Sequence, residues 1–234
     1  MSKIDANGME HGRRGDKIYV VLNGQQIKKA PYRPSNPRTP AQQMHRAKLA
    51  FANRLSAHLA EAVNLGFARV AEETKKQTPR NAFVKANWNN GSLRWNEDTS
   101  LWELCPERLL VANGPRHIPY GMTVEVEGNA LHIACPDAGL GNRDAVPEDQ
   151  LLVAVYLPDL PAMALYRGPL RDHCSRCTFE LPEEMCASGS TVHVYAWFRA
   201  TCFHRATGTK SQVRPDQSSP SRHLGTFHIP TSIH

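Results

Sequence analysis

The sequence predicts an α+β protein in which an N-terminal β-hairpin and helices are followed by an antiparallel immunoglobulin- or fibronectin-like β-sandwich. Three observations predict this. Two β-prone runs flank an Asn-Gly pair, residues 40–90 repeat apolar side chains at helical spacing, and short β-rich runs follow from about residue 105. We therefore divide the chain into residues 1–104, with a basic arm, hairpin, proline-rich connector and helices, and residues 105–234, a sandwich with a C-terminal tail.

The N-terminal element is predicted to be a hairpin. Residues 1–16 are charged and aperiodic, which predicts a flexible arm, and the chain then reads KIYVVLNGQQIKK. Because both central residues of a type I′ turn need positive φ, Asn23-Gly24 predicts strands near 17–22 and 25–29. Two strands alone are marginally stable, so we expect this hairpin to pack on the sandwich or on another subunit.

A stiff connector and a capped helix come next. Prolines at every third position of APYRPSNPRTP predict extended backbone. Thr39 is then expected to be the helix N-cap, with Pro40 at the first helical position and Gln42 completing a capping box. We expect Gly66 to break or bend this helix. Its buried stripe, ending near Leu65, is predicted to contain Met44, Ala47, Phe51, Leu55, Leu59, Ala62 and Val63.

Two further helical segments close the N-terminal region. The segment FARVAEETKKQ continues the helical period after the glycine. Thr78-Pro79 then repeats the cap-and-proline signal, which predicts a short third helix in RNAFVKANW.

Seven or eight short β-rich runs predict the sandwich: LLVAN, MTVEVEG, ALHIAC, LLVAVYL, MALYRG, CTFELP, TVHVYAWFRA and TFHIP. Glu125 and Glu127 alternate with valines, as in a half-exposed strand, and Gly128-Asn129 suits a tight turn. The last run follows a Ser/Pro linker. We expect this tail either to return to its own sheet or to add to the edge of a neighbouring copy.

Charge is distributed unevenly along the chain. Residues 1–90 hold 16 Lys or Arg against 6 Asp or Glu, whereas residues 91–234 hold 12 against 16. This asymmetry favours contact with nucleic acid, an anionic surface or the acidic face of another copy; solvated charge without a partner is the alternative. The predicted nucleic-acid-binding residues are Arg13, Arg14, Lys17, Lys28, Lys29, Arg33, Arg38, Arg46 and Lys48. The predicted assembly contacts are Tyr19, Val21, Tyr32, Phe227 and Ile229.

Patterns for catalysis and metal binding are weak. The sequence contains no GxSxG, HExxH or GxxxxGK[ST] motif. Cys174 and Cys177 form one CxxC pair, but the remaining ligand types are scattered, so a zinc site and a disulfide from Cys174 are alternatives to free apolar thiols. His193 alternates with valines and is predicted to be structural. We expect no enzyme activity, no cofactor and no bound metal.

The sequence also bears on location. It contains no run of about 18 apolar residues. Its first residues, MSKIDANGMEHGRRG, lack the apolar stretch of a secretory signal. We expect no membrane span, and a location in the cytoplasm or in a virion-like particle.

Four segments together resemble an uncharacterised Bacteroidetes family known only as a domain of unknown function: YVVLNGQQI, NPRTPAQQMHRAKLAF, NLGFARVAEETKKQTPRNAFVKAN and VHVYAWF. In that family an NG hairpin leads to an NPRTxAQ helix start, a TxxNAF helix and a β-rich C-terminal half. The resemblance covers nearly the whole chain and implies this layout, but it carries no catalytic residues. The six cysteines and eleven histidines exceed what the resemblance implies.

These observations favour a non-enzymatic, self-assembling structural protein, such as a subunit of a phage-like particle, shell, tube or filament. We expect a homo-oligomer whose basic N-terminal region contacts nucleic acid. Two alternatives belong to other classes: a monomeric or dimeric nucleic-acid-binding module without sequence specificity, and a surface β-sandwich that binds glycan or protein.

Overall fold

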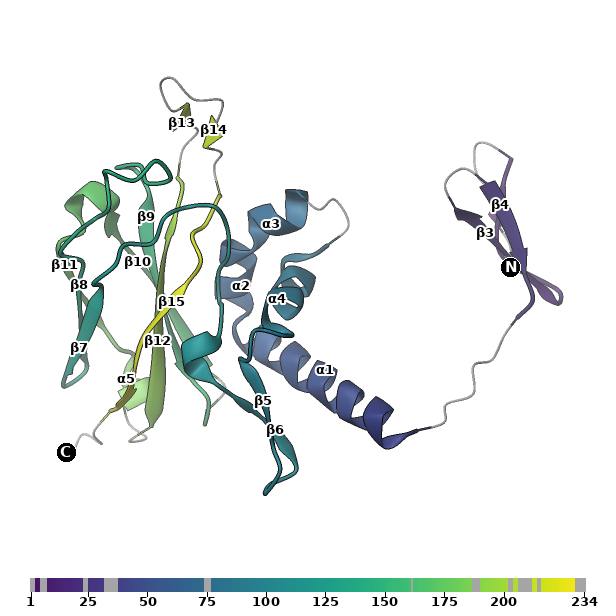
Figure 1. Cartoon of the computed structure of the whole chain (residues 1–234), viewed down its shortest axis with the longest axis horizontal. Helices are drawn as coiled ribbons and strands as arrows, with labels where there is room; N and C mark the ends of the chain where they lie inside the picture. Colours follow the sequence, from purple (N-terminus) through teal and green to yellow (C-terminus); the bar gives the residue numbers. More distant parts are fainter. Residues whose placement is uncertain are drawn as a thin grey trace. The chain divides into compact units, whose positions relative to one another are not determined.

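The chain forms two compact units, Met1–Gln43 and Met44–His234, in a computed structural model (Figure 1). The structure describes residues 3–4, 8–22, 25–31, 38–73, 77–160, 162–186, 190–201, 204–205, 212–213 and 216–229.

The first unit contains a four-stranded antiparallel sheet in the order β1 (Lys3–Ile4), β2 (Glu10–Arg14), β3 (Lys17–Leu22) and β4 (Gln25–Lys29). Strands β3 and β4 confirm the predicted hairpin, and Val20 pairs with Ile27 across it. The prediction of a flexible arm over residues 1–16 is wrong for the described residues, because β1 and β2 extend the sheet. A tight turn at Gly15, where φ is +60°, lets β2 fold back onto the open edge of β3.

Helix α1 (Pro40–His58) begins at the predicted residue. The backbone N–H of Gln42 donates to Thr39 Oγ1 at 3.4 Å, and α4 (Pro79–Asn87) is capped in the same way by Thr78. Between them lie α2 (Ala60–Gly66) and α3 (Ala68–Glu73). The predicted buried stripe is wrong in its first part: the residues of α1 up to position 50 are exposed, Lys48 apart, and burial starts at Phe51.

The second unit is built around a four-stranded antiparallel sheet and a three-stranded one. The first has the order β10 (Ala162–Leu170), β9 (Gln150–Leu157), β12 (Thr191–Arg199) and β15 (Arg222–His228). The second has the order β11 (Arg176–Glu180), β8 (Ala130–Ala134) and β7 (Thr123–Glu127). The smaller elements are the pairs β5 (Leu93–Asn96) with β6 (Leu101–Leu104) and β13 (His204–Arg205) with β14 (Gln212–Val213), and the short helices η1 (Pro106–Arg108), η2 (Arg171–His173) and α5 (Glu183–Cys186).

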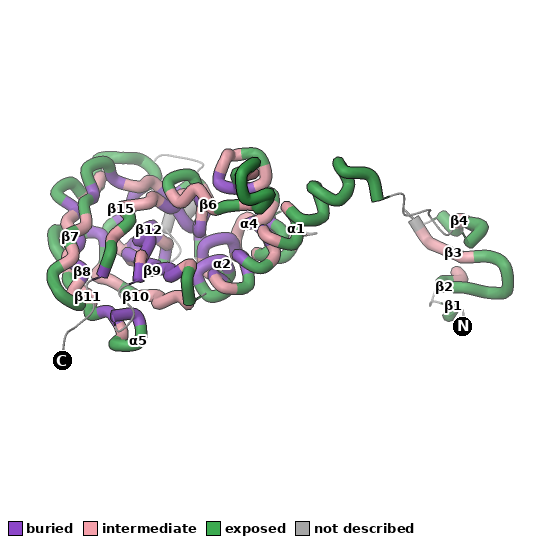
Figure 2. The backbone as a smooth tube through the Cα atoms, turned by 90° about the horizontal axis from the view of Figure 1, so that it is seen from below, coloured by how far each residue is buried: buried purple, intermediate pink, exposed green. Residues whose placement is uncertain are grey.

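Two apolar clusters lie on opposite faces of the four-stranded sheet. Tyr195 and Trp197 face the helices, where Phe67 and Phe83 pack edge to face. The intervening residues of β12, such as Phe198, face the three-stranded sheet. Figures 1 and 2 show the result: helices on one side, the three-stranded sheet on the other, and buried strands β9 and β12 between them. Both central strands therefore read as continuous apolar runs.

Because the helices share a core with the sheet, the units divide between Gln43 and Met44, whereas the boundary predicted from the sequence lies after residue 104. Two strand assignments also differ. The run at 109–113 is not a strand but a buried irregular segment, and the β5–β6 hairpin was not predicted. The mixed α+β class with antiparallel sheets is confirmed. Membership in the immunoglobulin or fibronectin class stays a prediction.

Candidate functional surfaces

The N-terminal sheet buries none of its described residues. Every described residue of Met1–Gln43 is exposed or half-exposed, and Ile4 retains 68% of its surface. Side chains alternate between the faces of a strand, so Ile18 and Val20 share one face, and cross-strand pairing adds Ile27 to it. A strip of β-branched side chains therefore lies on this sheet with no core of its own, which is unusual for residues of this type.

The basic residues of the sheet are divided between its two faces. Arg13 and Lys29 both pair with Ile18 and share its face. On the other face, Lys28 pairs with Tyr19 and places Nζ 5.7 Å from the ring centroid, and Val21 lies beside them. Of the predicted nucleic-acid and assembly residues, those in β2, β3 and β4 are thus brought into one sheet but not onto one of its faces.

Other predicted N-terminal residues have separate environments. Arg14 and Lys17 pair with each other, and Arg14 also forms an ion pair with Glu10 at 2.7 Å. Arg38 is exposed, with φ at +47°, and its carbonyl accepts from the Gln43 side chain at 2.6 Å. Tyr32 and Arg33 lie outside the described residues. The first unit carries 8 Lys or Arg against 3 Asp or Glu, a net charge of +5.

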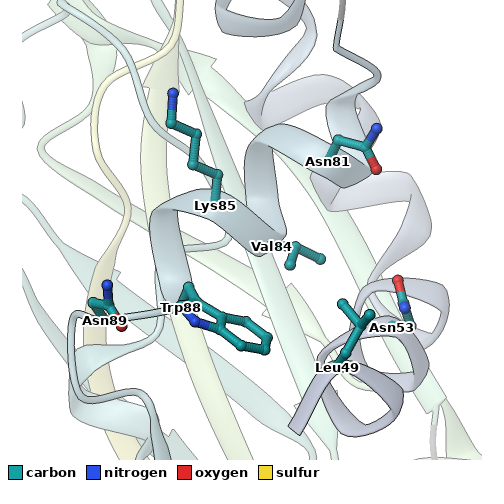
Figure 3. A pocket seen from close by; sticks show the side chains of 7 residues that line it. All are labelled: Leu49, Asn53, Asn81, Val84, Lys85, Trp88 and Asn89. Carbon is teal, nitrogen blue, oxygen red and sulfur yellow. The ribbon is translucent and has the colours of Figure 1, made fainter. Parts of the chain in front are cut away.

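A second surface is the α1–α4 groove, an open pocket of about 530 Å³ in the second unit. Figure 3 shows its apolar floor, where Leu49 of α1 faces Val84 and Trp88. Polar side chains form the rest of the lining: Asn53, Asn81, Lys85 and Asn89. The groove thus combines an indole ring with amide and ammonium groups.

Lys48 contacts two tryptophans of its own chain. Its Nζ donates to the Trp88 carbonyl at 2.6 Å and lies 4.7 Å and 4.9 Å from the ring centroids of Trp88 and Trp102. Burial lowers the pKa of this amine. The ammonium thus contacts two indole rings, and sequence spacing does not reveal tryptophans that lie 40 and 54 positions away. The role of Lys48 as a nucleic-acid contact stays a prediction.

The helices that border the groove contain no acidic residue. The sequences of α1 and α4 hold no Asp or Glu, while their basic residues are Arg46, Lys48, Arg54, Arg80 and Lys85. Arg80 Nη2 donates to the Asn53 carbonyl at 3.1 Å and so links the two helices. Arg80 and Lys85 were not among the predicted site residues, because only packing brings α4 beside α1. The signal available in the sequence was the absence of acids from both segments.

The C-terminal tail, which carries the predicted assembly contacts Phe227 and Ile229, returns to its own sheet, one of the two expected alternatives. Strand β15 pairs with β12, and the Ile229 N–H donates to the Ser190 carbonyl at 3.1 Å. Ile229 is buried and Phe227 packs against the same apolar cluster, on the side of the three-stranded sheet. The tail returns to its own sheet for two reasons. The edge of β12 that is not paired with β9 offers free backbone hydrogen-bonding groups, and the adjoining apolar cluster buries the side chains of the tail.

The candidate chemical residues lie in structural positions. Cys105, Cys135, Cys174, Cys177 and Cys186 are free thiols, and Cys202 lies outside the described residues. Contact with Cys174 and burial raise the pKa of the Cys135 thiol, which makes it less reactive. His193 is buried, and its Nδ1 pairs with Thr226 Oγ1 at 2.9 Å, which agrees with the structural role predicted for it. In the described ranges, no group of three His, Cys, Asp or Glu side chains is arranged to hold a metal ion.

Within the described part of the chain, none of the helices has the length and apolar character required to span a membrane. Comparisons with protein-family models, curated proteins and solved structures find no match to this chain.

Proposed function

We propose that the chain is a non-enzymatic subunit of a self-assembling structure, such as a shell, tube, filament or phage-like particle, and that its N-terminal sheet docks on another copy. The observation that carries this proposal is a four-stranded sheet in which no described residue is buried. Each residue held in one conformation costs about 1–2 kcal/mol of chain entropy, and burial of apolar surface is the main contribution that offsets that cost.

The apolar strip on the sheet supplies the missing burial when it is covered. Ile18, Val20 and Ile27 lie on one face and are each half-exposed. Complete burial of such a side chain stabilises by about 1.5–3 kcal/mol relative to full exposure. Arg13 and Lys29 flank the strip, so an acidic surface on the partner copy complements it.

Light scattering coupled to size-exclusion chromatography tests this proposal. The full chain is expected to elute as an oligomer, and Val20→Glu to shift it toward monomer because the new carboxylate would be buried on docking. Gln26→Glu is the matched control: it adds the same charge on the same hairpin but on the opposite face, and it should leave the oligomer intact. A wild-type chain that stays monomeric at high concentration contradicts the proposal.

A second candidate function rests on a different observation: the two helices that border the α1–α4 groove contain basic residues but no Asp or Glu. We propose that this basic surface contacts the nucleic-acid backbone without reading its sequence. Arg54 and Lys85 are exposed there, and Trp88 offers a ring for stacking. Binding to generic DNA and RNA is expected to weaken steeply as salt rises.

Paired variants make this second test specific. Lys85→Gln should reduce both the affinity and the salt dependence, since one phosphate contact is lost. Arg167→Gln, an exposed change of equal charge on β10, should have no effect. An affinity that does not vary with salt rules out this mode.

We also propose that the two sheets of the second unit form a fibronectin-like sandwich. Counting the strands from β7 without the β13–β14 pair, one sheet has the order 5-2-1 and the other 4-3-6-7. The fourth strand therefore joins the third, whereas in the constant-type immunoglobulin order it lies beside the fifth. The shared apolar cluster between the sheets supports this proposal. We also propose that the chain belongs to the Bacteroidetes family that its sequence resembles.

A further inference from the structure

A polar pocket of about 260 Å³ lies on the second unit and shares no lining residue with the α1–α4 groove. It is formed by the segment before β7, the loop before β9 and the start of β15. Three of its lining residues can carry positive charge: Arg116, His117 and Arg222. Its other polar lining residues are Tyr120, Asn142 and Asp144.

Basic side chains outnumber acidic ones among the residues that line this pocket. Behind it, the buried carboxylate of Asp149 accepts from Arg116 Nη2 at 2.8 Å and from Arg171 Nε at 3.1 Å. One carboxylate thus serves two buried guanidinium groups. Among the residues that line the pocket, Arg116, His117 and Arg222 are basic and Asp144 is acidic, and Asp137 is a second carboxylate close to His117. The lining is therefore mainly basic, which favours an anion over a cation as the ligand.

One donor in this group has no partner. Arg116 is 3% exposed, and its Nε–H makes no hydrogen bond within the described part of the chain. A buried N–H without an acceptor costs about 1–3 kcal/mol. Burial, followed by the charges of Arg171 and Arg222, lowers the pKa of His117, while Asp137 and Asp144 act in the opposite direction.

The walls of the pocket are held in place by charged side chains. Arg171 donates to the carbonyls of His117 at 2.7 Å and Ala138 at 2.8 Å, and it stacks on Phe198. Arg222 Nη1 donates to the Pro119 carbonyl at 2.5 Å. These bonds fix three separate segments relative to one another, so a ligand would meet a preformed site.

We propose that this pocket binds the oxyanion group of a small ligand, a phosphate or a carboxylate, through Arg116, His117 and Arg222. A guanidinium has five N–H donors in a planar fork, and Arg222 uses one of them on Pro119. Tyr120, which is 80% exposed and lies with its ring 5.2 Å from the Arg222 guanidinium, provides a surface for the remainder of the ligand. This site is independent of the proposed assembly function.

Isothermal titration calorimetry of the full chain tests the proposal, with inorganic phosphate and citrate as separate probes at constant ionic strength. Saturable binding of one or both is expected, and the stronger probe identifies the class of oxyanion. Arg222→Gln should weaken binding by roughly tenfold, the loss of one charge-assisted hydrogen bond. Asp144→Asn should strengthen binding, because it removes a carboxylate that repels the anion.

Arg143→Gln is the control for charge alone. This exposed arginine adjoins Asp144 in the sequence but does not line the pocket, so its removal should leave the affinity unchanged. Three outcomes overturn the proposal: no saturable binding of either anion, an equal loss in Arg143→Gln and Arg222→Gln, or no gain in Asp144→Asn. Thermal unfolding of each variant establishes that the fold is retained.

Discussion

Buried polar residues of the second unit are paired across long stretches of sequence. Asp149 lies at the centre of one such group, where it also accepts from the backbone N–H of Val146 at 3.2 Å. His193 is held in a second group by Thr226, whose hydroxyl also lies 3.3 Å from His223 Nε2. A buried polar side chain without a hydrogen-bond partner lowers the stability of the fold. Each group therefore favours the one strand register in which its members meet.

The His193 group predicts how stability depends on pH. Burial and the proximity of His223 lower the pKa of His193 below its ordinary value of 6.5, and burial also lowers the pKa of His223. The unfolded chain therefore binds protons more readily. The stabilisation from the neutral rings is complete above pH 6.5 and is lost as the pH falls through the lowered pKa values.

Urea unfolding of the second unit measured from neutral pH downward should show this loss, and His193→Gln should make the curve flatter. His45→Gln, on the exposed start of α1, is the control and should leave the slope unchanged. A wild-type stability that does not fall with acidification would falsify the assignment of His193 as a buried neutral ring.

Helices and strands meet at positions where side-chain volume is restricted. Gly66 ends α2, and a Cβ atom at this position would lie 2.6 Å from the Cα of Ala112. Beside this close approach, the backbone N–H of Asn113 donates to the Gly66 carbonyl at 3.1 Å. The sequence predicts a break or bend of the helix at this glycine. The structure adds a second role, close approach of α2 to the buried segment 109–113.

Gly66→Ala is therefore expected to destabilise the second unit by about 1–3 kcal/mol, the usual cost of overpacking. The matched control is Gly141→Ala, where an added Cβ meets no atom within 4 Å. Denaturant titrations of both variants provide the measurement. Equal stabilities for the two would show that α2 can move away from residue 112 at little cost.

At the scale of the whole molecule, the two units differ in how they are stabilised. Both apolar clusters of the second unit draw their buried residues from Ala52 onward, whereas the first unit buries no described residue. Stability should therefore reside in the second unit, and the first should become fully ordered only when a partner covers its sheet.

Removal of residues 1–37, which leaves helix α1 intact, should change the free energy of unfolding of the remainder by less than about 0.5 kcal/mol, the range of changes outside a core. The same deletion should abolish assembly. Thermal unfolding and light scattering on one sample separate the two effects. A deletion that leaves the oligomer intact locates the contacts in the second unit.

Local features of this protein were predictable from neighbouring residues alone. The strands around Asn23-Gly24 and the helix starts at Thr39 and Thr78 have the predicted boundaries, because caps and hairpins depend on residues within a few positions of each other. Positively charged residues of α1 were also identified, since charge is read directly from composition. The extension of the hairpin by β1 and β2 was not predicted. No strong turn signal precedes β3, and these strands pair because the edge of β3 is open, which the sequence does not show.

Only the tertiary structure decided which surfaces exist. Asp149 lies 33 positions from Arg116 and 22 from Arg171, and no local rule brings these three side chains together. The same holds for the groove between α1 and α4, where packing against the central sheet places Trp88 beside Leu49. Local backbone preferences set where elements begin and end, whereas burial of both faces of one sheet determines which distant residues meet.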